Sequence, residues 1–63
     1  MEKTLEILLE QIRLKRQQIV EAVSTNAAKD YAEYQKLCGD IRGLSMAEGF
    51  ILDLAKQMEF SDD

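Results

Sequence analysis

Apolar residues recur at helical spacing along two long stretches of this chain, and one polar break separates the stretches. The first stretch runs from about Glu2 to Val23 and the second from about Tyr31 to Phe60. In both, apolar residues three and four positions apart form the pattern of one buried helix face, and no proline interrupts either stretch. Two helices joined by a short connection pack antiparallel. The sequence therefore predicts an all-α, two-helix hairpin, with residues 1–63 as a single domain.

The break covers residues 24–30 and holds a Ser-Thr-Asn run. Such side chains compete with the helix by hydrogen-bonding to nearby backbone groups. The second helix is expected to begin after Asp30, because an N-cap acceptor followed three residues later by Glu33 satisfies the first free backbone N–H groups. A start at Asn26 or Ala27 is the alternative.

The length of the break suggests how the two helices align. If Val23 faces Tyr31, residues whose numbers sum to about 54 lie opposite one another in an antiparallel pair. Beyond about Asp53 the second helix then outruns the first, so that Leu54, Met58 and Phe60 have no cover within the chain. Because an exposed apolar overhang of this kind marks an interaction surface, the chain is expected to bind a partner.

The size of the chain points the same way. A domain of 63 residues buries only about 60% of its unfolded surface and is marginal alone. Small domains gain stability from disulfides, metals or partner chains. The single cysteine, Cys38, cannot form an internal disulfide, and the lack of histidine argues against a zinc site. Self-association or docking on a larger protein is therefore expected to complete the core.

The second helix carries two glycines one turn apart, although glycine in a helix interior costs roughly 0.5–1 kcal/mol relative to alanine. With the next small residue they form a Gly-x-x-x-Gly-x-x-x-Ala row on one side of the helix, which favours the close approach of another helix. The alternative is that the glycines bend the helix or lie exposed at small cost. The expected interface residues are Leu37, Gly39, Gly43, Leu44, Ala47, Ile51, Leu54 and Met58.

Charged residues interrupt both apolar stripes. Arg16 falls within the stripe of the first helix, and Asp40 and Glu48 fall within that of the second. The expected register brings Arg16 near Asp40, so we predict a partly buried Arg16–Asp40 pair that fixes the register. The alternative is that Arg16 extends to solvent at the edge of the core. Arg42 lies off the stripe and either binds a carboxylate of a partner chain or is solvated.

The composition argues against most chemical functions. Twelve acidic and eight basic residues give a net charge of −4, whereas nucleic-acid binding needs a basic surface. Glu6 and Glu10 lie one turn apart, but without histidine or a third ligand an ordinary solvated face accounts for them. No phosphate loop, nucleophile motif or metal-spaced cluster is present. The chain is therefore expected to be no enzyme and to need no cofactor.

The same sequence predicts no contact with a membrane. No apolar run reaches the roughly 18–20 residues that span a bilayer. Glu2 and Glu6 interrupt the apolar residues at the N-terminus, so no signal peptide is expected. The unpaired Cys38 fits a reducing compartment.

The run from Asp30 to Leu44 contains the pattern Tyr-x-x-Leu-Cys-Gly-x-Ile-Arg-Gly-Leu, and the chain ends in an acidic Ser-Asp-Asp tail. These features resemble a group of short proteins encoded by tailed bacteriophages. The resemblance implies a phage origin, in the host cytoplasm during infection or in the virion. It implies two roles: a structural or assembly protein that packs with itself or with virion proteins, or a soluble inhibitor or adaptor that binds a host protein. A ROP-like nucleic-acid-binding regulator shares the hairpin shape alone, and the net charge argues against it.

Overall fold

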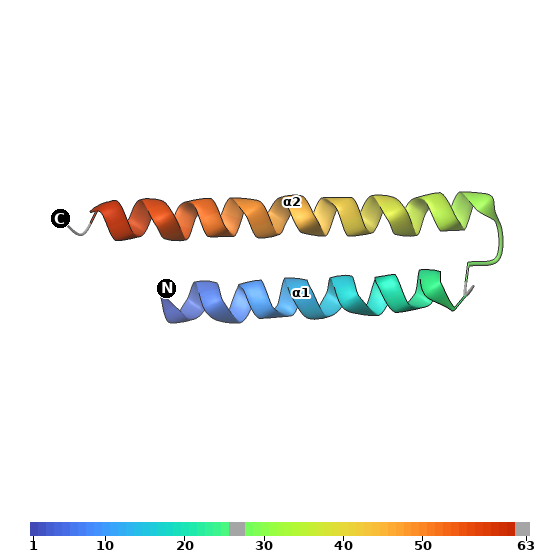
Figure 1. Cartoon of the computed structure of the whole chain (residues 1–63), viewed down its shortest axis with the longest axis horizontal. Coiled ribbons are helices and arrows are strands. Elements are labelled where there is room, and N and C mark those ends of the chain that lie inside the picture. Colours follow the sequence, from blue (N-terminus) through green and yellow to red (C-terminus); the bar gives the residue numbers. More distant parts are fainter. Residues whose placement is uncertain (26–27, 62–63) are drawn as a thin grey trace.

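Two antiparallel helices form the whole of the described structure. The computed structural model describes residues 1–25 and 28–61, with side chains as far as Glu59. Helix α1 (Lys3–Ser24) and helix α2 (Tyr31–Ser61) lie side by side (Figure 1). The pair measures 51 × 16 × 12 Å, and no strand occurs in the described ranges. The predicted all-α helical hairpin is confirmed.

Polar side chains close both ends of α1. The Glu2 carboxylate accepts hydrogen bonds from the backbone N–H groups of Thr4 at 3.0 Å and Leu5 at 3.3 Å. These bonds, the one from Thr4 most of all, lower the pKa of Glu2. At the other end, the Thr25 hydroxyl donates to the Glu21 carbonyl at 2.9 Å, beside a backbone bond between the same residues at 3.0 Å. The free backbone groups at the helix ends thus find local partners.

Helix α2 begins with the expected cap. The Asp30 carboxylate accepts from the Glu33 N–H at 2.8 Å, and the Glu33 carboxylate reaches back to the Lys29 N–H at 3.5 Å. This arrangement resembles a capping box in which Asp replaces Ser or Thr, but Glu33 binds the N–H of Lys29, the residue before the cap, instead of that of Asp30. The predicted start after Asp30 is confirmed, and the alternative start at Asn26 or Ala27 falls outside the described residues.

Each helix turns one row of residues, spaced alternately four and three positions apart, toward the other helix. This is the heptad spacing of a coiled coil, and we call the two rows the seam. The row on α1 is Leu5, Leu9, Ile12, Arg16, Ile19 and Val23, and the row on α2 is Leu37, Ile41, Leu44, Glu48, Ile51 and Ala55. All of these side chains are buried or half-buried. Among the described residues only Leu9, Ile51 and Ala55 are buried hydrophobic residues, so the hairpin has a thin core.

The helices pair in a different register from the predicted one. Arg13 bonds to Glu48 and Arg16 bonds to Ser45, so opposite residues have numbers that sum to about 61 rather than about 54, a shift of roughly one heptad. The first turns of α2 extend beyond the end of α1 (Figure 1).

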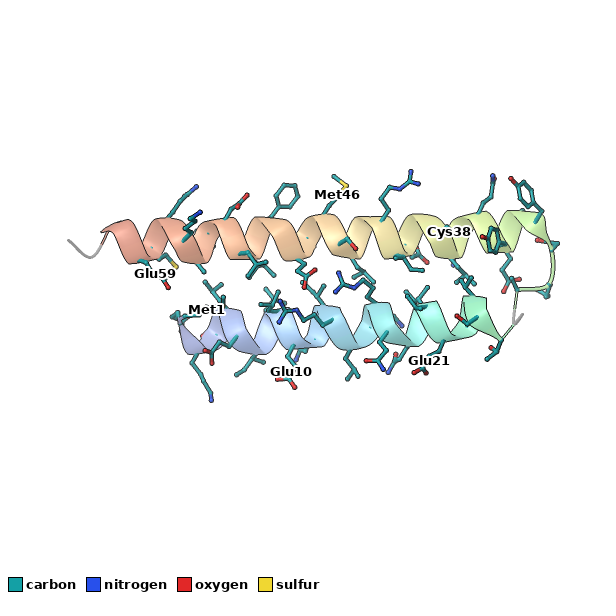
Figure 2. All side chains as sticks on the ribbon, in the orientation of Figure 1. Met1, Glu10, Glu21, Cys38, Met46 and Glu59 are labelled. Atoms are coloured by element: carbon teal, nitrogen blue, oxygen red, sulfur yellow. The ribbon has the colours of Figure 1, made fainter. Side chains whose placement is uncertain are left out.

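The shift also shortens the predicted overhang, although the C-terminal end of α2 still extends past the start of α1 (Figure 1). The predicted register leaves α2 uncovered beyond about Asp53, whereas Ala55 is buried in the structure. Met1 lines the same surface hollow as Ala55 and Glu59, on the side of each helix that faces the other (Figure 2). Leu54 remains exposed, because it lies beside the seam rather than beyond the end of α1.

Candidate helix-packing interface

Arg16 and Glu48 occupy seam positions that apolar residues hold elsewhere, and they bind each other. Glu48 Oε1 accepts from Arg16 Nη1 at 2.6 Å, and Glu48 Oε2 accepts from Arg13 Nε at 2.6 Å. Arg16 also donates to the Ser45 hydroxyl at 3.2 Å. The side chains of Arg16 and Glu48 are 27% and 17% exposed, so water screens their attraction only in part. This charged cluster ties the middle of α1 to the middle of α2.

The predicted Arg16–Asp40 pair is wrong. Arg16 binds Glu48 instead, and Asp40 is exposed. Asp40 directly precedes the seam residue Ile41 and so points to one side, whereas Glu48 continues the seam four residues after Leu44. The alternative, in which Arg16 extends alone to solvent, fails for the same reason. The four-and-three spacing was the sequence signal that could have identified Glu48 as the partner.

The two guanidinium groups hold Glu48 in its ionised form. The hydrogen bond from Arg16 makes the largest contribution and the one from Arg13 the next largest. Together they lower the pKa of Glu48 from 4.5 to about 2. If a carboxylate has a lower pKa in the folded chain than in the unfolded chain, it stabilises the fold at pH values above its unfolded-state pKa. That stabilisation is lost as the pH falls through the folded pKa.

We expect the melting temperature of the hairpin to fall as the pH is lowered from about 5 to about 2, and the fall to be smaller in Glu48→Gln. Circular dichroism melts at several pH values measure both. Protonation of the capping carboxylate of Glu2, whose pKa is also lowered, destabilises the fold at acid pH as well. A smaller fall of the melting temperature therefore remains in Glu48→Gln. Glu10 points away from α2 (Figure 2), and Glu10→Gln should retain the wild-type acid transition. Parallel profiles for wild type and Glu48→Gln would contradict the role of Glu48.

Side chains next to the seam form two long faces of the hairpin. Arg13 and Ser45 lie on one face, since each directly follows a seam residue and bonds across the seam. Positions seven apart share a face of a coiled coil. This face, which we call the Leu52 face, carries Glu6, Arg13 and Val20 on α1 and Cys38, Ser45, Leu52 and Glu59 on α2.

The opposite face carries the residues that directly precede seam positions. Leu8 precedes Leu9, and Leu54 precedes Ala55. Phe50 lies one turn from Leu54 and is exposed at the outer margin of the same face. We call this surface the Leu54 face, and its apolar members are Leu8, Ala47, Phe50 and Leu54. All of them except the half-buried Ala47 are exposed.

The residues predicted to form an interface fall into three groups. The seam inside the chain holds Leu37, Leu44 and Ile51. The Leu54 face and the adjoining end of the hairpin hold Ala47, Leu54 and Met58. Gly39 and Gly43 are exposed, and a Cβ added at either would meet nothing within 4 Å. Neither glycine is therefore needed for α1 to approach α2, and contact of this row with another chain stays a prediction.

Gly39 lies on the outer side of α2, away from α1. It is seven positions before Met46, which shares that side of the helix and projects away from α1 (Figure 2). Because nothing contacts its Cβ position, Gly39→Ala should raise the free energy of unfolding by about 0.5–1 kcal/mol through helix propensity. Urea denaturation measures this gain. Gly49→Ala, at a site equally free of neighbours, is the matched variant and should gain as much. A loss of stability specific to Gly39→Ala would mean that another helix packs on Gly39.

A shallow hollow lies over the first turns of α2. The rings of Tyr31 and Tyr34 stack there with centroids 6.3 Å apart. A side-chain hydrogen bond with the thiol of the free, half-buried Cys38 raises the pKa of Tyr34. Arg42 is exposed at the rim, so its binding to a carboxylate of another chain stays a prediction. The residues lining the hollow are Tyr31, Tyr34, Gln35, Cys38, Gly39 and Arg42.

Residues 1–25 and 28–61 contain neither a cluster of metal ligands nor a helix that could span a membrane. No group of three carboxylate, thiol or imidazole side chains gathers there closely enough to hold a metal ion. Neither α1 nor α2, within that part of the chain, combines the length and the hydropathy that crossing a bilayer requires. Comparisons with protein-family models, with curated proteins and with solved structures found no match to this chain.

Proposed function

We propose that this chain is a non-enzymatic structural or assembly protein of a bacteriophage, which acts through helix–helix packing in a virion or a homo-oligomer. The observation that carries the proposal is the apolar surface that the hairpin leaves uncovered. Among the described residues, twelve large hydrophobic side chains are exposed, whereas only three hydrophobic residues are buried. Exposed apolar surface on this scale is available for helix packing between chains. The phage origin rests on the sequence pattern of residues 34–44.

The total surface area supports the same proposal. A folded monomer of 7.2 kDa exposes about 4,100 Å², and this chain exposes 4978 Å². The excess of about 900 Å² is close to the roughly 800 Å² that one partner contributes to a stable protein–protein interface. A second protein surface is therefore the natural means of completing the core.

A soluble inhibitor or adaptor that binds a host protein is the second candidate function. The net charge of −4 favours it, because an acidic surface can cover the basic site of a nucleic-acid-binding protein. Glu10 and Glu21 project outward from α1 (Figure 2) and would contribute to such a surface. The same charge argues against a ROP-like regulator that binds nucleic acid itself.

Purified phage particles separate the two candidates. Under the first, peptides of this chain appear in gradient-purified particles at a fixed ratio to the major structural proteins, as measured by mass spectrometry. Under the second, the chain is absent from particles and co-purifies with one host protein from infected cells. Absence from both fractions in a productive infection would contradict both functions.

A further inference from the structure

We infer that a second copy of this chain covers the Leu54 face, in a two-fold dimer whose four helices form a bundle. The inference rests on the proposed function, since it names the partner and the surface through which the packing occurs. Of the two faces beside the seam, the Leu54 face has the larger apolar patch and the smaller acidic charge.

The apolar patch lies in the half of the hairpin near the termini. In the register of the structure, Leu9 lies opposite Ile51, and both are buried, at 5% and 9% exposure. Leu8 therefore lies across the seam from Leu54 on the same face, with Phe50 one turn along. Three large exposed side chains from two helices thus form one continuous surface.

The distribution of charge selects the same face for a second copy. Two chains of net charge −4 repel each other wherever their acidic surfaces meet. Where the two helices overlap, Asp40 is the only acidic residue on the Leu54 face, and Lys15 accompanies it. The Leu52 face carries two acidic residues, Glu6 and Glu59, and one basic residue, Arg13, which is bound to Glu48. Two copies can therefore approach through the Leu54 face without bringing rows of carboxylates together.

A two-fold axis parallel to the helices gives the dimer its arrangement. It places α1 of one copy on α2 of the other, again antiparallel, so that Leu8 of each copy meets Leu54 of the other. Such an interface is self-complementary, as two-fold symmetry requires. Gly43, which has no side chain, and the small Ala47 border this contact and permit the helices to come close. The area required, about 800 Å² per chain, matches the surface in excess of a monomer.

Two lysine substitutions test the inference. Leu54 and Leu52 are the same residue type, two positions apart on α2, 46% and 40% exposed, and on opposite faces. Light scattering at about 10 μM should give wild type and Leu52→Lys about twice the 7.2 kDa of one chain. Leu54→Lys should fall to about the mass of one chain. Circular dichroism checks that each variant keeps its helices, since both sites are exposed and tolerate lysine in the hairpin.

The opposite pattern would overturn the inference. If Leu52→Lys dissociates the oligomer and Leu54→Lys leaves it intact, the interface lies on the other face, while assembly through helix packing stands. If the wild type is a folded monomer of 7.2 kDa, the second copy is excluded as the occupant. The particle experiment then decides the proposed function independently.

Discussion

Leu9→Ala is expected to lower the free energy of unfolding by about 3 kcal/mol, within the range of roughly 2–5 kcal/mol for a leucine truncated in a packed core. Leu9 is the most buried hydrophobic side chain among the described residues, at 5% exposure. A domain of 63 residues has a total stability of only roughly 3–9 kcal/mol. The variant should therefore lose much of its helical circular dichroism signal at 25 °C, and urea titration measures how much.

Leu14 provides the matched control, because it is a leucine on the same helix with 57% of its surface exposed. It lies on neither the seam nor the Leu54 face. Leu14→Ala should change the stability by no more than about 0.5 kcal/mol, as surface substitutions usually do. Equal losses in the two variants would show that α1 turns a different face toward α2.

The second large effect is expected at the charged cluster in the seam. Arg16→Glu places a carboxylate against that of Glu48 in a partly buried position, where water screens the repulsion of like charges only in part. The melting temperature should fall steeply. The exchange Arg16→Glu with Glu48→Arg restores the attraction and should recover most of the loss, with Arg13, already half-exposed, turning to solvent.

The combination of Arg16→Glu with Asp40→Arg is the control for this exchange. It tests the pairing expected from the sequence, and the structure predicts no recovery from it. A double-mutant cycle separates the coupling from the effects of the single changes. Recovery through Asp40, or additive effects at Arg16 and Glu48, would show that the register of the helices is not the one described.

The fold class and the start of α2 were predictable because local rules determine them. Helical spacing without proline specifies two helices, and the Asp30 cap depends on residues three positions apart. The register was not predictable in this way. The break was assumed to close directly, which would place Tyr31 opposite Val23, whereas the observed register covers Ile51 and Ala55 and unites Arg16 with Glu48. Packing and charge along the seam, rather than the connection, determine how the helices align.

The candidate interface was likewise predictable only in part. The exposure of Leu54 was expected, but for the wrong reason, because an overhang was predicted where the structure has an uncovered side. Leu8 could not be distinguished from the neighbouring seam residue Leu9 by apolar periodicity alone. Its place beside Leu54 follows only once the register is known. The role of the glycine row depends on contacts between chains, which one hairpin does not contain.

Sedimentation equilibrium of the wild-type chain over a range of concentrations tests the central claim, that the exposed apolar face is covered by a second copy. We expect a dimer of about twice the 7.2 kDa of one chain, which exchanges with monomer only at the lowest concentrations. A folded species of 7.2 kDa at every concentration would contradict it.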